Sequence, residues 1–195
     1  MNSNCPTRDE AIELLHEYTK TDSLRRHALG VEQAMRKMAE KYDGNPDEWG
    51  ITGLMHDFDY EKYPSMEDHP FRGNEILKEK GYPKSITQAI MGHANYTGVS
   101  RDTDMAKALF AVDELTGFIF AVTYVRPSKS IFEVKPKSVK KKLKQKSFAA
   151  SVIREDIFQS IEELEVDMTE HIQFVIDALK EKADVLGLKG SVESA

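Results

Sequence analysis

The stretch ITGLMHDFD, residues 51–59, places a histidine–aspartate pair directly after an apolar run. Buried His and Asp side chains are costly unless a partner satisfies them. Side chains of adjacent helical residues point about 100° apart, so His56 and Asp57 do not stack on each other as an i, i+4 pair does. They can, however, converge on one small object between them. A divalent metal ion is the simplest such object, and the rest of the chain decides whether further ligands are available.

Length and composition describe a soluble globular protein. The chain has 195 residues, of which 40% are hydrophobic and 31% charged, and this length fits one domain. Neither a signal peptide nor an apolar run of about 18 residues that would cross a membrane is evident. The single cysteine, Cys5, allows no intramolecular disulfide and excludes a structural zinc finger. We therefore expect a cytoplasmic protein in which any metal is held by His, Asp and Glu.

Apolar residues recur at helical spacing along most of the chain, which predicts an all-α protein of about eight or nine helices. Thr7 and Glu10 form a capping-box pattern before the first helix. A second helix is expected from residue 22 or 23 to about residue 42, with His27 on its apolar face. Asn45 is the expected cap of the third helix, which carries the His–Asp pair.

Two further histidines lie at expected helix ends. Asp68 can cap a helix that begins at His69 and Pro70, which places His69 beside a polar loop. His93 lies near the C-terminus of the next helix, where a cation is favoured by the helix dipole. Both positions are compatible with metal ligation.

A long apolar helix is expected after Asp102 and Thr103, which can cap it. Between residues 108 and 125 its only charged residues are Asp113 and Glu114. A helix that is apolar on most faces is buried, so an acid in its middle needs a partner or a metal ion. We interpret Asp113 as a metal ligand, against the alternative of a neutral buried carboxyl group.

The C-terminal part predicts more amphipathic helices, the last from about residue 168 to 186 with His171 at its surface. Residues 130–134 are the one weak strand candidate. Seven lysines lie between residues 135 and 146, which stands out in a chain of net charge −6. Such a segment is either a solvated face or a wall that binds substrate phosphates. The candidates for phosphate binding are Arg126, Lys129, Lys140 and Lys141.

The candidate metal ligands come from five predicted helices or helix ends. They are His27, His56, Asp57, His69, His93 and Asp113. A mixed nitrogen and oxygen set without thiolate suits iron, manganese, zinc, nickel or cobalt. Six ligands in one small protein indicate one or two divalent ions, and two ions bridged by a carboxylate can clamp a phosphoryl group and activate water.

The order of these residues resembles the HD superfamily of metal-dependent phosphohydrolases, over roughly His27 to Asp113. The resemblance implies an all-α helical bundle and a first metal held by His27, the His56–Asp57 doublet and Asp113. It also implies that His69 and His93 hold a second ion, with Asp57 as the bridge. The chain departs from the common pattern after the doublet, where Phe58 and Asp59 stand and no lysine follows directly.

From this resemblance we expect one HD-type helical domain over residues 1–190, with a frayed tail at 191–195. Its metal-site core is expected over about 22–125 and its C-terminal helices over about 136–187.

The implied reaction is hydrolysis of a phosphoester or phosphoanhydride, with a nucleotide as the leading substrate. Metal-activated water attacks phosphorus, and Asp57, Asp59 and Glu61 are the catalytic candidates. Two alternatives stay open, a di-iron HD-fold oxygenase and a non-catalytic nucleotide-binding module. Nucleic acid is not an expected partner, because the net charge is negative and few aromatic residues accompany the lysines.

Overall fold

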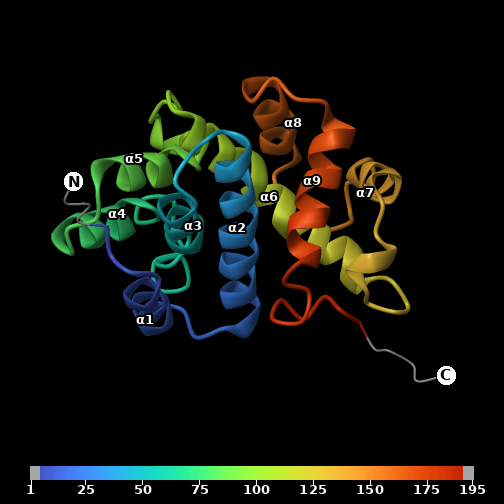
Figure 1. Cartoon of the computed structure of the whole chain (residues 1–195), viewed down its shortest axis with the longest axis horizontal. Coiled ribbons are helices and arrows are strands. Elements are labelled where there is room, and N and C mark those ends of the chain that lie inside the picture. Colours follow the sequence, from blue (N-terminus) through green and yellow to red (C-terminus); the bar gives the residue numbers. More distant parts are fainter. Residues whose placement is uncertain (1–4, 191–195) are drawn as a thin grey trace.

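The computed structural model describes residues 5–190, and within that range the protein is all-α, as the sequence predicts (Figure 1). The described residues contain no strand. The α-helices are α1 (Arg8–Tyr18), α2 (Asp22–Lys41), α3 (Pro46–Met55), α4 (Phe71–Glu79), α5 (Lys84–Gly92), α6 (Asp104–Tyr124), α7 (Pro136–Leu143), α8 (Arg154–Glu163) and α9 (Met168–Lys180). Two short 3-10 helices, η1 (Asn95–Thr97) and η2 (Ile131–Glu133), lie between them.

Helix α6 is the central element of the fold. Its side chains are apolar on most faces, so it is buried along its length. On one side it packs against α2 and α5, and on the other against α7, α8 and α9 (Figure 1). The hydrophobic core runs continuously through both groups of helices, from Met35 and Leu54 to Phe118 and Leu179.

Helices α2 and α3 approach each other closely, and a glycine makes this approach possible. A Cβ atom at Gly53 would lie 2.8 Å from the carbonyl oxygen of Val31 and 2.9 Å from Cγ of Met35. Helix α3 ends at Met55, so this contact also fixes the position of the residues that directly follow the helix, His56 and Asp57. The close packing therefore brings the end of α3 next to the histidine on α2.

Helix caps confirm several local predictions. Thr7 and Glu10 form the capping box of α1, and Asn45 accepts hydrogen bonds at the start of α3. Thr103 accepts a hydrogen bond from Ala106 N at the start of α6, at 3.2 Å. These short-range signals work because each cap depends only on residues within one helical turn.

Other boundaries differ from the prediction. Helix α3 ends before the His–Asp pair, and α4 begins at Phe71 without a side-chain cap, because the Asp68 carboxylate binds Ser65 and Arg72 instead. The strand candidate at residues 130–134 is a 3-10 turn, whose Ile131 N–H donates to Leu188 O at 2.8 Å. Helix α9 stops at Lys180 and is followed by turns.

His171 was expected at the surface, and that expectation is wrong. Its side chain is buried against α6, where its Nε2 donates to the carbonyl oxygen of Ala111 at 2.9 Å. The sequence predicts a surface position for His171 because this residue lies one step from the apolar stripe of its helix. The contact with α6 is a tertiary one that periodicity does not show.

The described helices include none that is both long and apolar enough to cross a bilayer. The predicted frayed tail at 191–195 lies outside the described residues. The proposed division of the chain into domains stays a prediction.

Candidate metal centre

The six predicted ligands meet at one place in the fold, in two groups of three. His27 of α2, His56 directly after α3 and Asp113 of α6 form the first group. The second group contains Asp57, His69 and His93. Within each group one ligand atom from every residue lies within 4.8 Å of the others, so each group could hold a metal ion.

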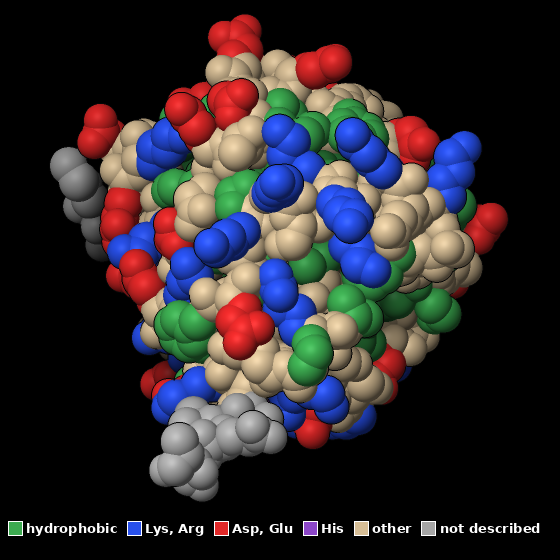
Figure 2. Space-filling model, turned by 90° about the vertical axis from the view of Figure 1, so that its right-hand side faces the viewer, with side chains coloured by type: hydrophobic (Ala, Val, Ile, Leu, Met, Phe, Trp, Pro, Cys, Tyr) green, Lys and Arg blue, Asp and Glu red, His purple; other side chains and the backbone are tan. Residues whose placement is uncertain are grey.

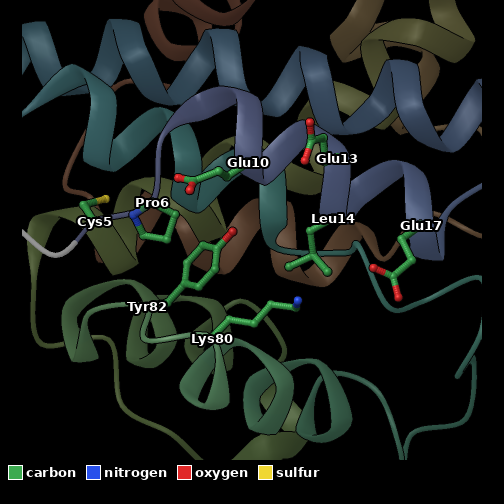
Figure 3. Close-up of a pocket in the computed structure, with 8 residues that line it drawn as sticks. All are labelled: Cys5, Pro6, Glu10, Glu13, Leu14, Glu17, Lys80 and Tyr82. Atoms are coloured by element: carbon green, nitrogen blue, oxygen red, sulfur yellow. The ribbon is translucent and has the colours of Figure 1, made fainter.

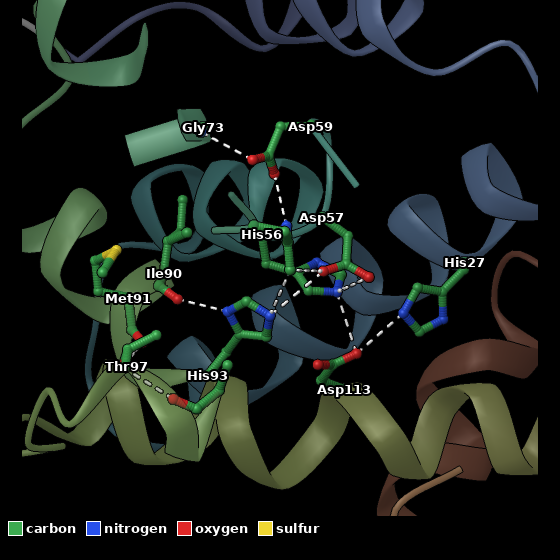
Figure 4. Close-up of polar contacts among 12 residues, drawn as sticks. His27, His56, Asp57, Asp59, Gly73, Ile90, Met91, His93, Thr97 and Asp113 are labelled. Atoms are coloured by element: carbon green, nitrogen blue, oxygen red, sulfur yellow. Dashed lines mark hydrogen bonds and ion pairs between the residues drawn. The ribbon is translucent and has the colours of Figure 1, made fainter. Parts of the chain in front are cut away.

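The first group is centred on one carboxylate oxygen. Asp113 Oδ1 lies 3.0 Å from His27 Nε2 and 3.1 Å from His56 Nε2 (Figure 4). The packing of α2 against α6 sets the first distance, and the end of α3 sets the second. Three residues far apart in sequence are thus held by helix packing.

The second group is centred on Asp57, which also faces the first. Asp57 Oδ1 lies 3.1 Å from His69 Nε2 and 3.4 Å from His93 Nε2, whereas its Oδ2 lies 3.5 Å from His56 Nε2. One oxygen of this carboxylate therefore belongs to each group. This is the arrangement that a bridging ligand requires.

Three of the imidazole rings are held from behind by their Nδ1 atoms. His56 Nδ1 donates to Gly53 O at 2.7 Å. His93 Nδ1 donates to Ile90 O (Figure 4). His69 Nδ1 donates to Asp59 Oδ1 at 2.8 Å. Carbonyl and carboxylate oxygens only accept, so in the neutral form of each ring the proton is on Nδ1 and the lone pair of Nε2 points into the site.

These lone pairs face one another, which tests whether a cation fits. His69 Nε2 and His93 Nε2 are 3.4 Å apart, and in their neutral forms neither atom can donate to the other. A cation placed between them and Asp57 would satisfy all three groups. The donor set of imidazole nitrogens and carboxylate oxygens suits a divalent transition metal.

The histidines and aspartates of the two groups shift one another's pKa values. Burial lowers the pKa of His56, but the Asp57 and Asp113 carboxylates outweigh it and raise that pKa to about 10. Burial likewise opposes the shift at His69, whose pKa the Asp57 and Asp59 carboxylates raise to about 9. Burial acts to raise the pKa values of Asp57 and Asp113, and neighbouring imidazoles, chiefly His56, hold them below the usual range. The site attracts positive charge.

Two predicted catalytic residues have other partners in the structure. Asp59 is fully buried, and its Oδ2 accepts from Gly73 N at 2.8 Å while its Oδ1 holds His69. Glu61 accepts from the backbone N–H groups of Lys20 and Thr21, at 2.7 and 3.0 Å. Asp59 therefore orients the ligand candidate His69, and Glu61 links the segment after α3 to the start of α2.

The lysine segment lies away from the centre. None of the predicted phosphate-binding residues Arg126, Lys129, Lys140 and Lys141 lines the cleft that contains the metal ligands. Lys140 and Lys141 of α7 are exposed, and Lys and Arg side chains are spread over the face on the side of the molecule where α7 lies (Figure 2). Their placement matches a solvated face, and phosphate binding by them stays a prediction.

The cleft beside the ligands has a volume of about 520 Å³. Besides the ligands it is lined by Tyr60, Asn95, Tyr96, Glu114 and Asp156, and by small and apolar residues. Burial and the adjacent Asp113 raise the pKa of Glu114 to about 8.

Sequence reasoning did not select Asn95, Glu114 or Asp156. For Glu114 there was a signal, because it is one of the two charged residues within the apolar part of α6.

A second hollow lies between α1 and the connection from α4 to α5 (Figure 3). It is lined by Cys5, Pro6, Glu10, Glu13, Leu14, Glu17, Lys80 and Tyr82. It contains no histidine and none of the six ligand candidates. The cleft at the two His/Asp groups is therefore the candidate site.

Comparison with known families agrees with this geometry. The family model of the HD domain matches residues 24–117. Searches of curated proteins and of solved structures gave no match to the chain. The matched range contains both His/Asp groups, from His27 to Asp113, and the part that follows it contributes Asp156 to the cleft. Over residues 24–117 this all-α chain is therefore similar to the HD-domain family.

Proposed function

We propose that the protein is a metal-dependent phosphohydrolase that transfers the phosphoryl group of a phosphate ester or anhydride to water. The observation that supports this function is the pair of His/Asp groups that share the Asp57 carboxylate in an open cleft. Two metal ions that share a carboxylate ligand would be suited to phosphoryl transfer. Most proteins with an HD domain are metal-dependent hydrolases, which points in the same direction.

The six ligand candidates divide between two ion positions. His27, His56 and Asp113 would hold one ion, His69 and His93 the other, and Asp57 would face both. Divalent ions bound there would neutralise charge on phosphate oxygens and lower the pKa of a water molecule. The overall reaction adds the water oxygen to phosphorus, breaks the bond to the leaving oxygen, and leaves a proton on that oxygen.

The chain itself positions these groups. The Asp59 carboxylate fixes the ring of His69, and Tyr96 donates its hydroxyl to the carbonyl oxygen of His69 at 2.8 Å. Preorganised ligands lose little freedom when ion and substrate bind. Tyr60 and Tyr96 are 41% and 42% exposed and line the cleft, so a nucleotide base has aromatic faces to contact. A nucleotide is the substrate we propose on this basis.

Metal content and turnover test the proposal together. Wild-type protein purified without an affinity tag is expected to bind about two ions per chain and, with them, to release phosphate from p-nitrophenyl phosphate. His93→Ala should retain about one ion, and Asp57→Asn should lose turnover with an unchanged circular dichroism spectrum. His16→Ala and Asp68→Asn, which alter residues outside the cleft, are the matched controls.

A wild-type protein that binds no metal after reconstitution with manganese, iron, cobalt, nickel and zinc would refute the proposal. Oxygen uptake by the iron-loaded protein without any phosphate release would instead support the oxygenase alternative. Turnover retained in Asp57→Asn would show that catalysis occurs elsewhere.

A further inference from the structure

The cleft has an unusual charge pattern for a site that would bind phosphate. Its lining contains four carboxylates, those of Asp57, Asp113, Glu114 and Asp156, and no Lys or Arg among the described residues. Divalent ions bound beside Glu114 would favour its ionised, accepting form. Two such ions would then offset four negative charges and leave no surplus positive charge. Proteins that bind polyphosphates usually surround them with Lys, Arg or backbone N–H groups. The cleft therefore suits a substrate with one phosphate.

Glu114 is a hydrogen-bond acceptor placed beside a metal ligand. It follows Asp113 on α6, and its Oε2 accepts from the backbone N–H of Ile153 at 3.2 Å. No described residue donates a hydrogen bond to its other oxygen. Ile153 lies outside the matched HD domain, so this contact joins the domain to the segment before α8. One oxygen of Glu114 remains for a ligand.

Asp156 is a second acceptor, supplied by the first turn of α8. Its Oδ1 accepts from Asn95 Nδ2 at 2.8 Å, and Asn95 Oδ1 in turn accepts from Arg101 Nη2 at 3.0 Å. Arg101 is also paired with Glu163 at 2.6 Å and is therefore committed on the far side of Asn95. The Arg101 guanidinium thus holds Asn95 in place without lining the cleft. Asp156 keeps its second oxygen for a ligand.

These two carboxylates come from different helices and each is oriented by a fixed partner. Two acceptors that are held apart can each bind a different hydroxyl group of a substrate. A single ammonium group matches them less well, because it would draw both carboxylates toward one point. Glu114 and Asp156 are partly buried, and such an acceptor also selects for substrates that donate to it, because an analogue without the donor leaves it unpaired. The part of the cleft formed by Glu114 and Asp156 thus suits a polar, hydroxyl-bearing group.

We propose that the substrate is a phosphate monoester of a hydroxyl-rich alcohol, and that Glu114 and Asp156 select it by accepting hydrogen bonds from its hydroxyl groups. This inference rests on the proposed phosphohydrolase function. Nucleoside monophosphates, with one phosphate and two ribose hydroxyls, fall within the class, whereas nucleoside triphosphates do not. The specificity residues lie partly outside the HD domain, on α8.

A matched pair of substrates isolates the hydroxyl groups. Glycerol 3-phosphate and propyl phosphate share the ester and the carbon chain and differ only in two hydroxyls. The metal-loaded wild type should have a kcat/KM for glycerol 3-phosphate at least about tenfold above that for propyl phosphate. The ratio should fall toward one in Glu114→Gln and Asp156→Asn. The exposed neighbour variant Glu155→Gln should keep the wild-type ratio. Because the ratio is taken within each variant, a general loss of activity cancels.

Binding gives a readout that does not depend on turnover. Calorimetry with 3,4-dihydroxybutylphosphonate and butylphosphonate, in which a methylene replaces the ester oxygen, should show the same preference and the same loss in both variants. Release of p-nitrophenol from p-nitrophenyl phosphate tests the parent function separately.

Wild-type turnover of p-nitrophenyl phosphate with a glycerol-to-propyl ratio near one would overturn this inference and leave the hydrolase function standing. Preference for ATP, or for 2-aminoethyl phosphate over glycerol 3-phosphate, would overturn it too. Absence of all turnover and of phosphonate binding would remove both the parent function and the inference.

Discussion

Asp59 shows how one buried carboxylate can matter without touching a substrate. It accepts from His69 Nδ1 on one oxygen and from Gly73 N on the other. A Cβ atom at Gly73 would lie 2.6 Å from Asp59 Cγ, so only glycine lets the start of α4 come this close. The carboxylate is thus shared between a metal-ligand candidate and the helix that follows it.

Asp59→Asn is therefore expected to weaken metal binding. An asparagine can accept with its oxygen from His69 or from Gly73 but not from both, because its NH₂ group faces the remaining donor. Loss of such a supporting contact typically reduces metal affinity by about 10–100-fold. Titration calorimetry with manganese would measure this.

Asp68→Asn is the control, since that carboxylate lies in the same connection but pairs with Ser65 and Arg72. Equal affinities of Asp59→Asn and wild type would mean that the orientation of His69 does not depend on Asp59. A loss in the control of the same size would mean that any change in this connection disturbs the site.

The packing of α9 against α6 contains a histidine that must stay neutral. His171 is 2% exposed, donates from Nε2 to Ala111 O, and has no partner for its Nδ1. Burial lowers its pKa, and the nearby Lys41 acts in the same direction. Protonation would add a charge and an orphan donor within this contact.

Stability should therefore fall as the pH drops below the ordinary histidine pKa of about 6.5. The folded-state pKa of His171 is depressed, so below that pH the unfolded chain binds the proton that the folded chain excludes. The slope from this group is at most about 1.4 kcal/mol per pH unit. Urea unfolding at pH 7 and pH 5 would measure it.

His171→Gln retains a donor for Ala111 O and cannot titrate, so it should reduce the pH dependence of the free energy of unfolding. His16→Gln, at an exposed position on α1, should leave that dependence close to wild type. Identical curves for wild type and His171→Gln would show that other groups cause the acid sensitivity.

At the scale of the helices, part of the structure was predictable from the sequence and part was not. Helices and the caps at Thr7, Asn45 and Thr103 were predictable because their determinants lie within a turn or two of chain. The six ligand candidates were predictable because each is a costly group on an apolar face or helix end. The placement of Asp59 and Glu61 was not, because their partners are fixed by how loops fold back on α2 and α4.

The same limit applies to the cleft wall. Asp156 lies at the site only because α8 packs on α6, and the local sequence around residue 156 does not predict that contact. The lysines of α7 illustrate the reverse case. Their density left a solvated face and a phosphate wall as alternatives, and the fold places Lys140 and Lys141 on an exposed face away from the cleft.

Over the whole molecule, the candidate centre joins distant parts of the chain. Its ligands come from α2, from the ends of α3 and α5, from the connection before α4, and from α6. A ligand that binds only the folded state stabilises it by mass action, about 2.7 kcal/mol at a hundredfold excess over Kd. For a chain of this size, such a gain raises Tm by roughly 5–10 °C.

We therefore expect manganese or iron to raise the Tm of metal-free wild type by that amount, and chelation to reverse it, as measured by calorimetry. His93→Ala removes a ligand from one group only, so it should keep a smaller increase. Lys140→Ala, on the face remote from the cleft, should respond as wild type does. Hydrogen exchange should locate the effect, with greater slowing at the end of α3 and in α5 than in α7. If the ions bind but Tm and exchange in these segments do not change, the ions occupy surface positions and the two His/Asp groups are not the metal centre.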